Sequence, residues 1–392
     1  MRGFGRKKKV WKIRCLPGLI LLGMLLFCFP VFGSEWLPVD GIPGEDWSEL
    51  DQFLQQQRGE QEEFLTFRDL VKALMEGDGK KAGRGILTSL HRALFQEISH
   101  GTQLWGELLA VGLVGAVFAN FSHIFTGSQI SETAFFMTYL LALTLLVSIF
   151  SDSMEIAQSV LVRQIEFLRV LLPCYFSAAA WSGGSLSAAA WMEFFLFLIA
   201  AVQWLYLRLL IPMTRVYILL VMAGNMAKED MLSRLTQLLQ SGIRWATRSL
   251  IGLVAGFQLV QGFVLPYADS VQTAGVQKLL QAIPGVGDGV GAVTKMLLGS
   301  GVLLKNTMGA AAVVILVILS AAPLLKLLLL LFLYRTAAGI LQPVGDKRLV
   351  ACIESVAEGQ KMLLGLAAAG LLLFSVTIGL VCAGTNGAYL GI

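Results

Sequence analysis

The longest apolar run of the chain covers residues 308–341 and is interrupted mainly by Pro323, Lys326 and Arg335. As a single α-helix it would be roughly 51 Å long, whereas the hydrocarbon core of a bilayer is about 30 Å thick. Proline cannot donate a backbone hydrogen bond inside a helix, and a lysine in this position needs cover from protein or water. The pattern therefore predicts a helix that breaks at Pro323 and a buried, structured interior around Lys326.

Further apolar runs predict additional membrane crossings. They lie at about 108–125, 134–150, 250–268 and 363–383, and residues 188–227 are long enough for two spans. The amphipathic stretch 152–167 is predicted to lie in the membrane interface. The short run 170–180, interrupted by Pro173, is predicted to be a re-entrant or interfacial segment and not a full span. The basic stretch 228–248 is the best candidate for a cytoplasmic loop. The fold class predicted is all-α: a polytopic membrane domain, residues 104–392, with six to eight helical crossings and broken or re-entrant helices.

The N-terminal third has a different pattern. A basic start followed by an apolar run and a small residue, Gly33, predicts a signal peptide over residues 1–33, and an uncleaved signal anchor is the alternative. Residues 34–103 are acidic and contain short stretches with apolar residues at helical spacing. Whether the signal is cleaved or stays as an anchor, this small helical segment is expected outside the cytoplasm. Its shortage of basic residues agrees with that side, because cytoplasmic flanks of membrane spans are enriched in Lys and Arg. Its few large apolar groups form a marginal core, so we expect it to dock on the membrane domain or on a partner.

The composition agrees with a membrane protein. Of 392 residues, 56% are hydrophobic and only 14% are charged, whereas soluble domains have about 25% charged residues. The formal net charge of +4 arises from seven basic residues among the first fourteen, so nothing indicates a basic face for nucleic acid. The cysteines beyond the signal region, Cys174, Cys352 and Cys382, are expected to be small buried hydrophobes. No spacing of histidine, cysteine or carboxylate residues predicts a metal, cofactor or catalytic site.

Three features have both a functional and a structural interpretation. Glu193 and Lys326 are ionisable residues within predicted spans. Such residues line solute paths in some membrane proteins, and in others they form structural ion pairs or extend their charged ends to the membrane surface, and the sequence favours neither interpretation. The Lys305–Asn306 pair precedes the apolar run, and capping of a helix start by Asn306 is its structural explanation. The glycine-rich stretch 284–291 lacks the context of a nucleotide-binding loop, so a turn or close helix packing is favoured. These residues alone do not distinguish between three functions: a transporter, a channel component and an assembly scaffold.

Several short motifs, in this order along the chain, carry a resemblance to a known family. They are Ser182-Gly183-Gly184, Ile283-Pro284-Gly285, Leu303-Leu304-Lys305-Asn306-Thr307-Met308-Gly309, Pro323 with Lys326, and Leu341-Gln342-Pro343. The chain resembles the stage III sporulation protein AE family over about residues 60–385, most closely over 283–345. Nine membrane positions are candidates for a structural or functional role. Eight lie in these motifs, namely Lys305, Asn306, Pro323, Lys326, Gln342, Pro343, Gly183 and Gly184, and the ninth is the ionisable residue Glu193.

The resemblance implies a function. Members of this family are multi-pass proteins of the mother-cell membrane that surrounds the forespore in endospore-forming bacteria. They act with the other proteins of the stage III sporulation A complex and a forespore partner, in an assembly that resembles a secretion system and forms a channel. A YidC-type insertase is implied in their membrane insertion, and no catalytic residue, cofactor or metal is implied. The expected function is thus a non-enzymatic channel component, and a permease-like transporter of small solutes is the alternative.

Overall fold

The computed structural model describes residues 48–56, 67–75, 128–181, 185–226, 232–281, 287–343 and 347–384. These ranges are helical throughout, apart from turn residues at Leu232 and at Gln342–Pro343, which agrees with the predicted all-α fold. The helices are α3 (Ser48–Gln56), α4 (Phe67–Met75), α6 (Ser128–Trp181), α7 (Ser185–Val202), η2 (Gln203–Leu210), α8 (Ile211–Met226), α9 (Ser233–Gln281), α10 (Gly287–Leu341) and α11 (Lys347–Gly384).

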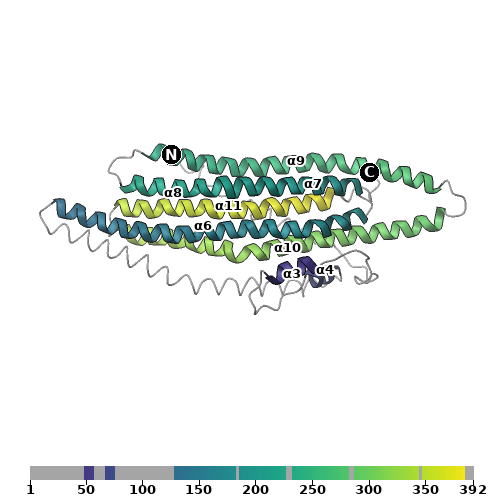
Figure 1. Cartoon of the computed structure of the whole chain (residues 1–392), viewed down its shortest axis with the longest axis horizontal. Helices are drawn as coiled ribbons and strands as arrows, with labels where there is room; N and C mark the ends of the chain where they lie inside the picture. The colour runs from purple at the N-terminus through teal and green to yellow at the C-terminus, as the bar shows by residue number, and fades with distance from the viewer. Residues whose placement is uncertain are drawn as a thin grey trace, which may run out of the picture.

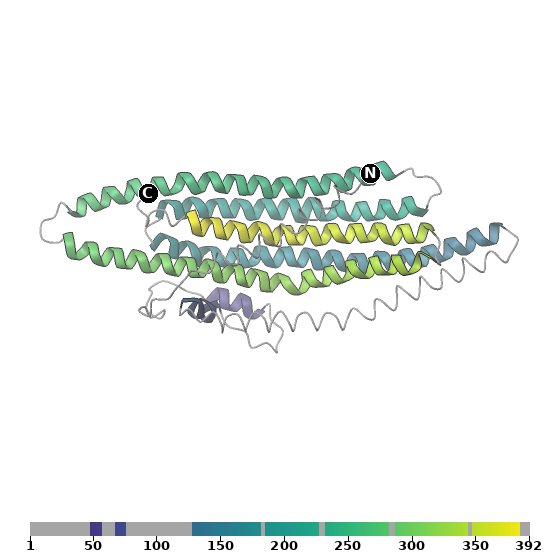
Figure 2. The ribbon, with the colours of Figure 1, turned by 180° about the vertical axis from the view of Figure 1, so that it is seen from behind.

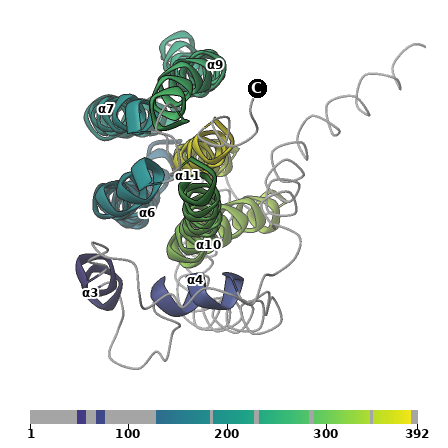
Figure 3. The ribbon, with the colours of Figure 1, turned by 90° about the vertical axis from the view of Figure 1, so that its right-hand side faces the viewer.

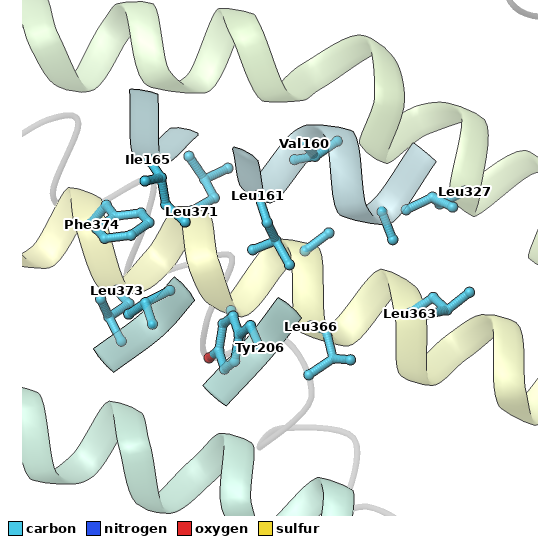
Figure 4. Packing of buried hydrophobic residues seen from close by; sticks show 14 of the residues in the cluster. Val160, Leu161, Ile165, Tyr206, Leu327, Leu363, Leu366, Leu371, Leu373 and Phe374 are labelled. Atoms are coloured by element: carbon cyan, nitrogen blue, oxygen red, sulfur yellow. The ribbon is translucent and has the colours of Figure 1, made fainter. Parts of the chain in front are cut away.

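The long helices form one elongated bundle in which α11 is central. Figure 1 shows α6 to α11 side by side along a common axis, and the end-on view of Figure 3 places α11 among α6, α9 and α10. α11 packs against α10, α9, α6 and α8. Its sequence is suited to this position because residues 362–384 contain no charged side chain. Figure 4 shows Leu366 and Phe374 of α11 among buried side chains of the surrounding helices, which include Leu161, Ile165 and Tyr206.

In the described part of the chain, four segments are long and apolar enough to cross a membrane. They are Tyr139–Ala180, Met192–Asn225, Gly299–Leu341 and Lys347–Cys382, with 42, 34, 43 and 36 residues. They overlap the predicted spans at 134–150 and 363–383, the stretch 188–227 that was expected to form two spans, and the apolar run 308–341. The prediction of six to eight crossings is not confirmed. Each segment exceeds the ~20 residues that a bilayer needs, so each helix continues beyond the hydrocarbon region.

The predicted break at Pro323 is wrong. Pro323 lies inside α10, which continues for 55 residues, and Pro173 lies in the same way inside the 54 residues of α6. A proline removes one backbone hydrogen bond and bends a helix, and neighbouring helices in a membrane bundle tolerate this loss. Figure 2 shows α10 bent along its length but unbroken. The predicted re-entrant run 170–180 and the predicted interfacial stretch 152–167 are parts of the same continuous α6.

Two further helices are longer or less regular than predicted. Residues 188–227 do not form two separate spans, because α7, η2 and α8 follow one another without a gap, and η2 is an eight-residue π-helix. The predicted span 250–268 lies within α9, a 49-residue helix that also includes most of the predicted cytoplasmic loop 228–248. α9 is not among the four segments that meet the length and composition of a span. The predicted span 108–125 lies outside the described residues.

The two short N-terminal helices dock on the bundle. α3 contacts α6, α4 contacts α10, and Leu50, Phe67 and Val71 are fully buried. The rings of Phe53 and Phe167 lie 6.3 Å apart, and the backbone N–H of Phe67 donates to Asp51 Oδ1 at 3.1 Å. For these two helices the expectation of docking on the membrane domain is confirmed. The predicted signal peptide and most of the acidic segment 34–103 lie outside the described residues.

Candidate functional site

The positions selected from the sequence do not gather into one site. Six of them lie on α10 or directly after it, and from Lys305 to Pro343 the helix rises by roughly 57 Å. Gln342 and Pro343 are exposed in the turn that follows α10, where the Gln342 N–H donates to Ala338 O at 3.0 Å. Glu193 lies on the exposed face of α7. Gly183 and Gly184 fall between α6 and α7, outside the described residues.

Lys305 is the most unusual of these positions because its side chain is completely buried. A buried ammonium group is costly unless other groups balance its charge, so this residue is under strong structural or functional constraint. Asn306 lies inside α10 and not at its start, so the predicted capping role does not apply. Its Oδ1 is buried and has no hydrogen-bond partner among the described residues. Thr307 is also buried, and its hydroxyl donates to Leu303 O at 2.8 Å.

Pro323 and Lys326 lie about one turn apart on α10. Pro323 is buried, and Lys326 is half-buried. At the next residue, α11 approaches the same helix through a buried amide: Gln360 Nε2 donates to Leu327 O at 3.1 Å. The Oε1 of Gln360 has no partner among the described residues. This contact joins α10 to α11 beside the proline and agrees with a structural role for this part of α10.

A polar contact in the middle of the bundle joins three helices. Gln164 of α6 and Ser320 of α10 are both fully buried, and Gln164 Nε2 donates to Ser320 Oγ at 2.9 Å. The Ser320 hydroxyl donates in turn to Leu316 O at 2.7 Å. On α11, a Cβ at Gly370 would lie 2.8 Å from Gln164 Oε1, so only glycine fits without a shift of the amide. Polar contacts of this kind fix helix pairing in membranes.

Sequence reasoning missed this contact, although a signal for it existed. Ser320 is a polar residue inside the longest apolar run, and Gly370 is a small residue inside another. Nothing in the linear sequence indicated that Gln164 faces Ser320, because the two are separated by 156 positions.

The π-helix η2 was also missed. Such segments are rare and often mark functional positions, and here Gln203 Oε1 accepts a hydrogen bond from Arg169 Nη2 of α6 at 2.7 Å.

Charged residues outside the interior form surface contacts. Glu358 of α11 accepts from both Arg335 and Lys361, each at 3.1 Å, and all three side chains are partly solvent-exposed. Exposed ion pairs of this type contribute about 0–1 kcal/mol. Cys352 and Cys382 are buried, which agrees with their predicted role as small buried hydrophobes, whereas Cys174 is half-buried. Within the described residues, no group of three or more His, Cys, Asp or Glu side chains is arranged to hold a metal ion.

Long apolar helices with a few fully buried polar side chains between them define an all-helical membrane protein. The family model described as Stage III sporulation protein AE matches residues 65–385, and the chain belongs to this family. The Stage III sporulation protein AE of Bacillus subtilis (strain 168) is 24% identical to it over 291 residues, which cover 73% of each chain. No solved structure matches the chain. The family resemblance predicted from the sequence motifs is confirmed.

Proposed function

We propose that this chain is a non-enzymatic component of a channel or secretion-like complex that connects the mother cell with the forespore during endospore formation. The observation that carries this proposal is the family match, which extends over most of the chain and over all helices from α6 to α11. The expected location is the mother-cell membrane around the forespore. The expected partners are the other proteins of the stage III sporulation A complex, its forespore partner and a YidC-type insertase.

The side-chain arrangement supports a role in assembly. The interior polar contacts that join α6, α10 and α11 use amide and hydroxyl groups, which hold helices together and perform no chemistry by themselves. Large hydrophobic side chains are exposed on α6, α7, α9 and α10, so lipid or other membrane proteins must cover these surfaces. A subunit of a larger membrane assembly has both features.

A permease-like transporter of small solutes is the second candidate. The complete burial of Lys305 favours it, as do the amide oxygens of Asn306 and Gln164, which have no hydrogen-bond partner in the described part of the chain, because solute paths use polar groups in the bundle interior. Against it, Glu193, one of the two residues expected on such a path, lies on the exposed face of α7. The other, Lys326, is half-buried beside the bend of α10.

The proposal is tested in the sporulating host. Affinity purification of the tagged chain after chemical crosslinking should recover other membrane proteins of the sporulation complex, and a strain without the chain should not form heat-resistant spores. Recovery of the chain alone, together with normal sporulation in the deletion strain, would contradict the proposal.

A substitution separates the two candidate functions. If the chain acts as a scaffold and no solute path passes Lys326, Lys326→Leu should still assemble and support sporulation, because leucine retains most of the apolar volume of the lysine stem. In a transporter, the same variant should assemble but lose solute transport when reconstituted in vesicles. The exposed Glu193→Gln serves as the matched control and should behave as the unmodified chain in both assays.

A further inference from the structure

α9 lies at the edge of the bundle, and one side of it has no neighbour among the described helices. It packs on α11, α8 and α7, and the end-on view of Figure 3 shows it at the periphery beside α7. Ile243 and Val254 are buried against these helices. On the opposite side of α9, side chains are exposed from Arg234 to Val260. This outward side is therefore open to contact with another molecule.

One stripe of this outward side is polar and basic. Its members are exposed and follow one another at intervals of three and four residues: Arg234, Gln237, Ser241, Arg244 and Arg248. That spacing places them in one line along the helix, about 21 Å long. Among the residues that the structure describes, none of the three arginines forms an ion pair with a carboxylate. No acidic residue occurs in the sequence between positions 233 and 268, so α9 supplies no counter-charge of its own.

A second stripe runs beside the first and is apolar, with gaps at small residues. Its members follow one another at intervals of four and three residues: Leu238, Gly242, Trp245, Ser249, Gly252 and Gly256. Leu238 and Trp245 are 69% and 73% exposed. A Cβ at any of the three glycines would meet no other atom within 4 Å, so the space above them is open. Large side chains next to open glycines form the knobs and holes through which one helix packs on another.

No uniform surroundings satisfy both stripes, whatever the position of α9 relative to a membrane. Water would leave the large apolar side chains of Leu238 and Trp245 hydrated. Lipid tails would leave three guanidinium groups in hydrocarbon. The headgroup layer on each side of a bilayer is about 5–8 Å thick, which is much less than the length of the basic stripe. A surface that is charged along one line and apolar along the next is instead suited to a second amphipathic helix.

We infer that the outward side of α9 docks an amphipathic helix of another protein, which carries an apolar stripe and, along one flank, a row of Asp and Glu residues. This inference rests on the proposed function, in which the chain is one subunit of a larger membrane complex. In paired helices the residues beside the apolar seam select the partner, and an all-basic flank selects an acidic one. A second copy of α9 does not fit, because it would bring no carboxylate to these arginines.

The two stripes also indicate how the partner helix is built along its length. The basic stripe ends at Arg248, whereas the apolar stripe continues through Gly252 to Gly256. Glycines four residues apart allow the closest approach of two helix backbones. The partner is therefore expected to carry its carboxylates opposite Arg244 and Arg248, and to lie closest to α9 about two turns further on.

Photocrosslinking from position 245 tests the inference. Trp245 is replaced by the photoreactive amino acid p-benzoylphenylalanine in the full chain, and sporulating cells that express it are irradiated. We expect an adduct with another protein, and peptide mapping should place the adduct in a helix with Asp or Glu at intervals of three or four residues. The charge-reversed variant Arg244→Glu, Arg248→Glu should lower the yield of this adduct about tenfold or more, because like charges then face each other. Exchange of those acidic residues for lysine should restore the yield.

Two controls accompany this experiment. The same photoreactive group at Phe332, which is 57% exposed on α10, should give products that the arginine substitutions do not change. The variant Arg244→Gln, Arg248→Gln removes the charges without reversing them, so it should lower the yield of the position-245 adduct less than the charge-reversed variant does. It also replaces the charge-reversed variant if that one does not accumulate in the cells.

Each other crosslinking result overturns the inference. These results are an adduct with a second copy of the chain, an adduct with a phospholipid, an adduct in a segment without acidic residues, a yield that is insensitive to the arginine substitutions, and no adduct at position 245. Copurification of the chain with the complex is measured in the same cells. A normal complex with any of these results refutes the docking surface alone, whereas a chain that never copurifies refutes the proposed function.

Discussion

Gly370 offers a sharp test of the packing in the middle of the bundle. In Gly370→Ala, the new Cβ would lie 2.6 Å from Leu161 Cδ2 and 2.8 Å from Gln164 Oε1. Both distances require a shift, and Gln164 is held by its hydrogen bond to Ser320. Overpacking of this kind costs about 1–3 kcal/mol, against a gain of roughly 1 kcal/mol from the better helix propensity of alanine. We expect Gly370→Ala to be less stable than the unmodified chain by up to about 2 kcal/mol.

The same helix supplies a matched control. Gly365 is also on α11, but a Cβ there would meet no atom within 4 Å. Gly365→Ala should therefore show only the propensity gain, so the two variants should differ by about 1–3 kcal/mol in the free energy of unfolding. The measurement is titration of detergent-solubilised protein with sodium dodecyl sulfate, followed by circular dichroism. Equal shifts of the two variants in the same direction would refute the packing described around Gly370.

A double substitution identifies the atom responsible. Gln164→Ala removes the Oε1 that the new methyl group would meet, while the Ser320 hydroxyl keeps its bond to Leu316 O. The combined Gly370→Ala, Gln164→Ala variant should therefore be more stable than the sum of the two single effects predicts, with a coupling of about 0.5–3 kcal/mol. Strict additivity would show that Gln164 and position 370 do not interact.

Two further predictions concern α10. Lys305→Glu should sharply reduce the yield of monodisperse protein, because reversing a fully buried charge leaves the charges around it uncompensated, at a cost of about 3–5 kcal/mol. Lys326 is half-buried, so Lys326→Glu should reduce this yield less. Equal yields of the two variants in size-exclusion chromatography would contradict the burial of Lys305. Because α10 is continuous through Pro323, the backbone amides that follow it should be protected in hydrogen–deuterium exchange, and fast exchange across residues 324–331 would indicate the broken helix that the sequence suggested.

The sequence predicted what depends on composition and local pattern. Apolar runs marked helices that are present, and the spacing of Leu50, Leu54 and Phe67 indicated a short N-terminal region that docks on a larger body. The ordered motifs around Lys305 and Gln342 identified the family. Each of these signals lies within a few turns of chain and needs no information about distant contacts.

Sequence reasoning failed where distant packing decides the outcome. A rule based on proline predicted breaks near Pro173 and Pro323, but the loss of one hydrogen bond is small against the packing of helices with more than fifty residues. The partners of Gln164 and the wide turns of η2 depend on the arrangement of α6 against its neighbours. The selected positions on α10 proved to be a series along one helix and not a cluster, because a linear motif carries no information on which residues meet in space.

The uninterrupted length of α6 has a mechanical consequence. Its 54 residues form a rod of roughly 81 Å, more than twice the thickness of the hydrocarbon core. Gln164 holds this rod to α10 about two-thirds of the way from Ser128 to Trp181, so a displacement of one end is transmitted along one continuous helix. Because α6 is so much longer than the hydrocarbon core, the protein must project as a rigid element into the space beyond the bilayer that it crosses.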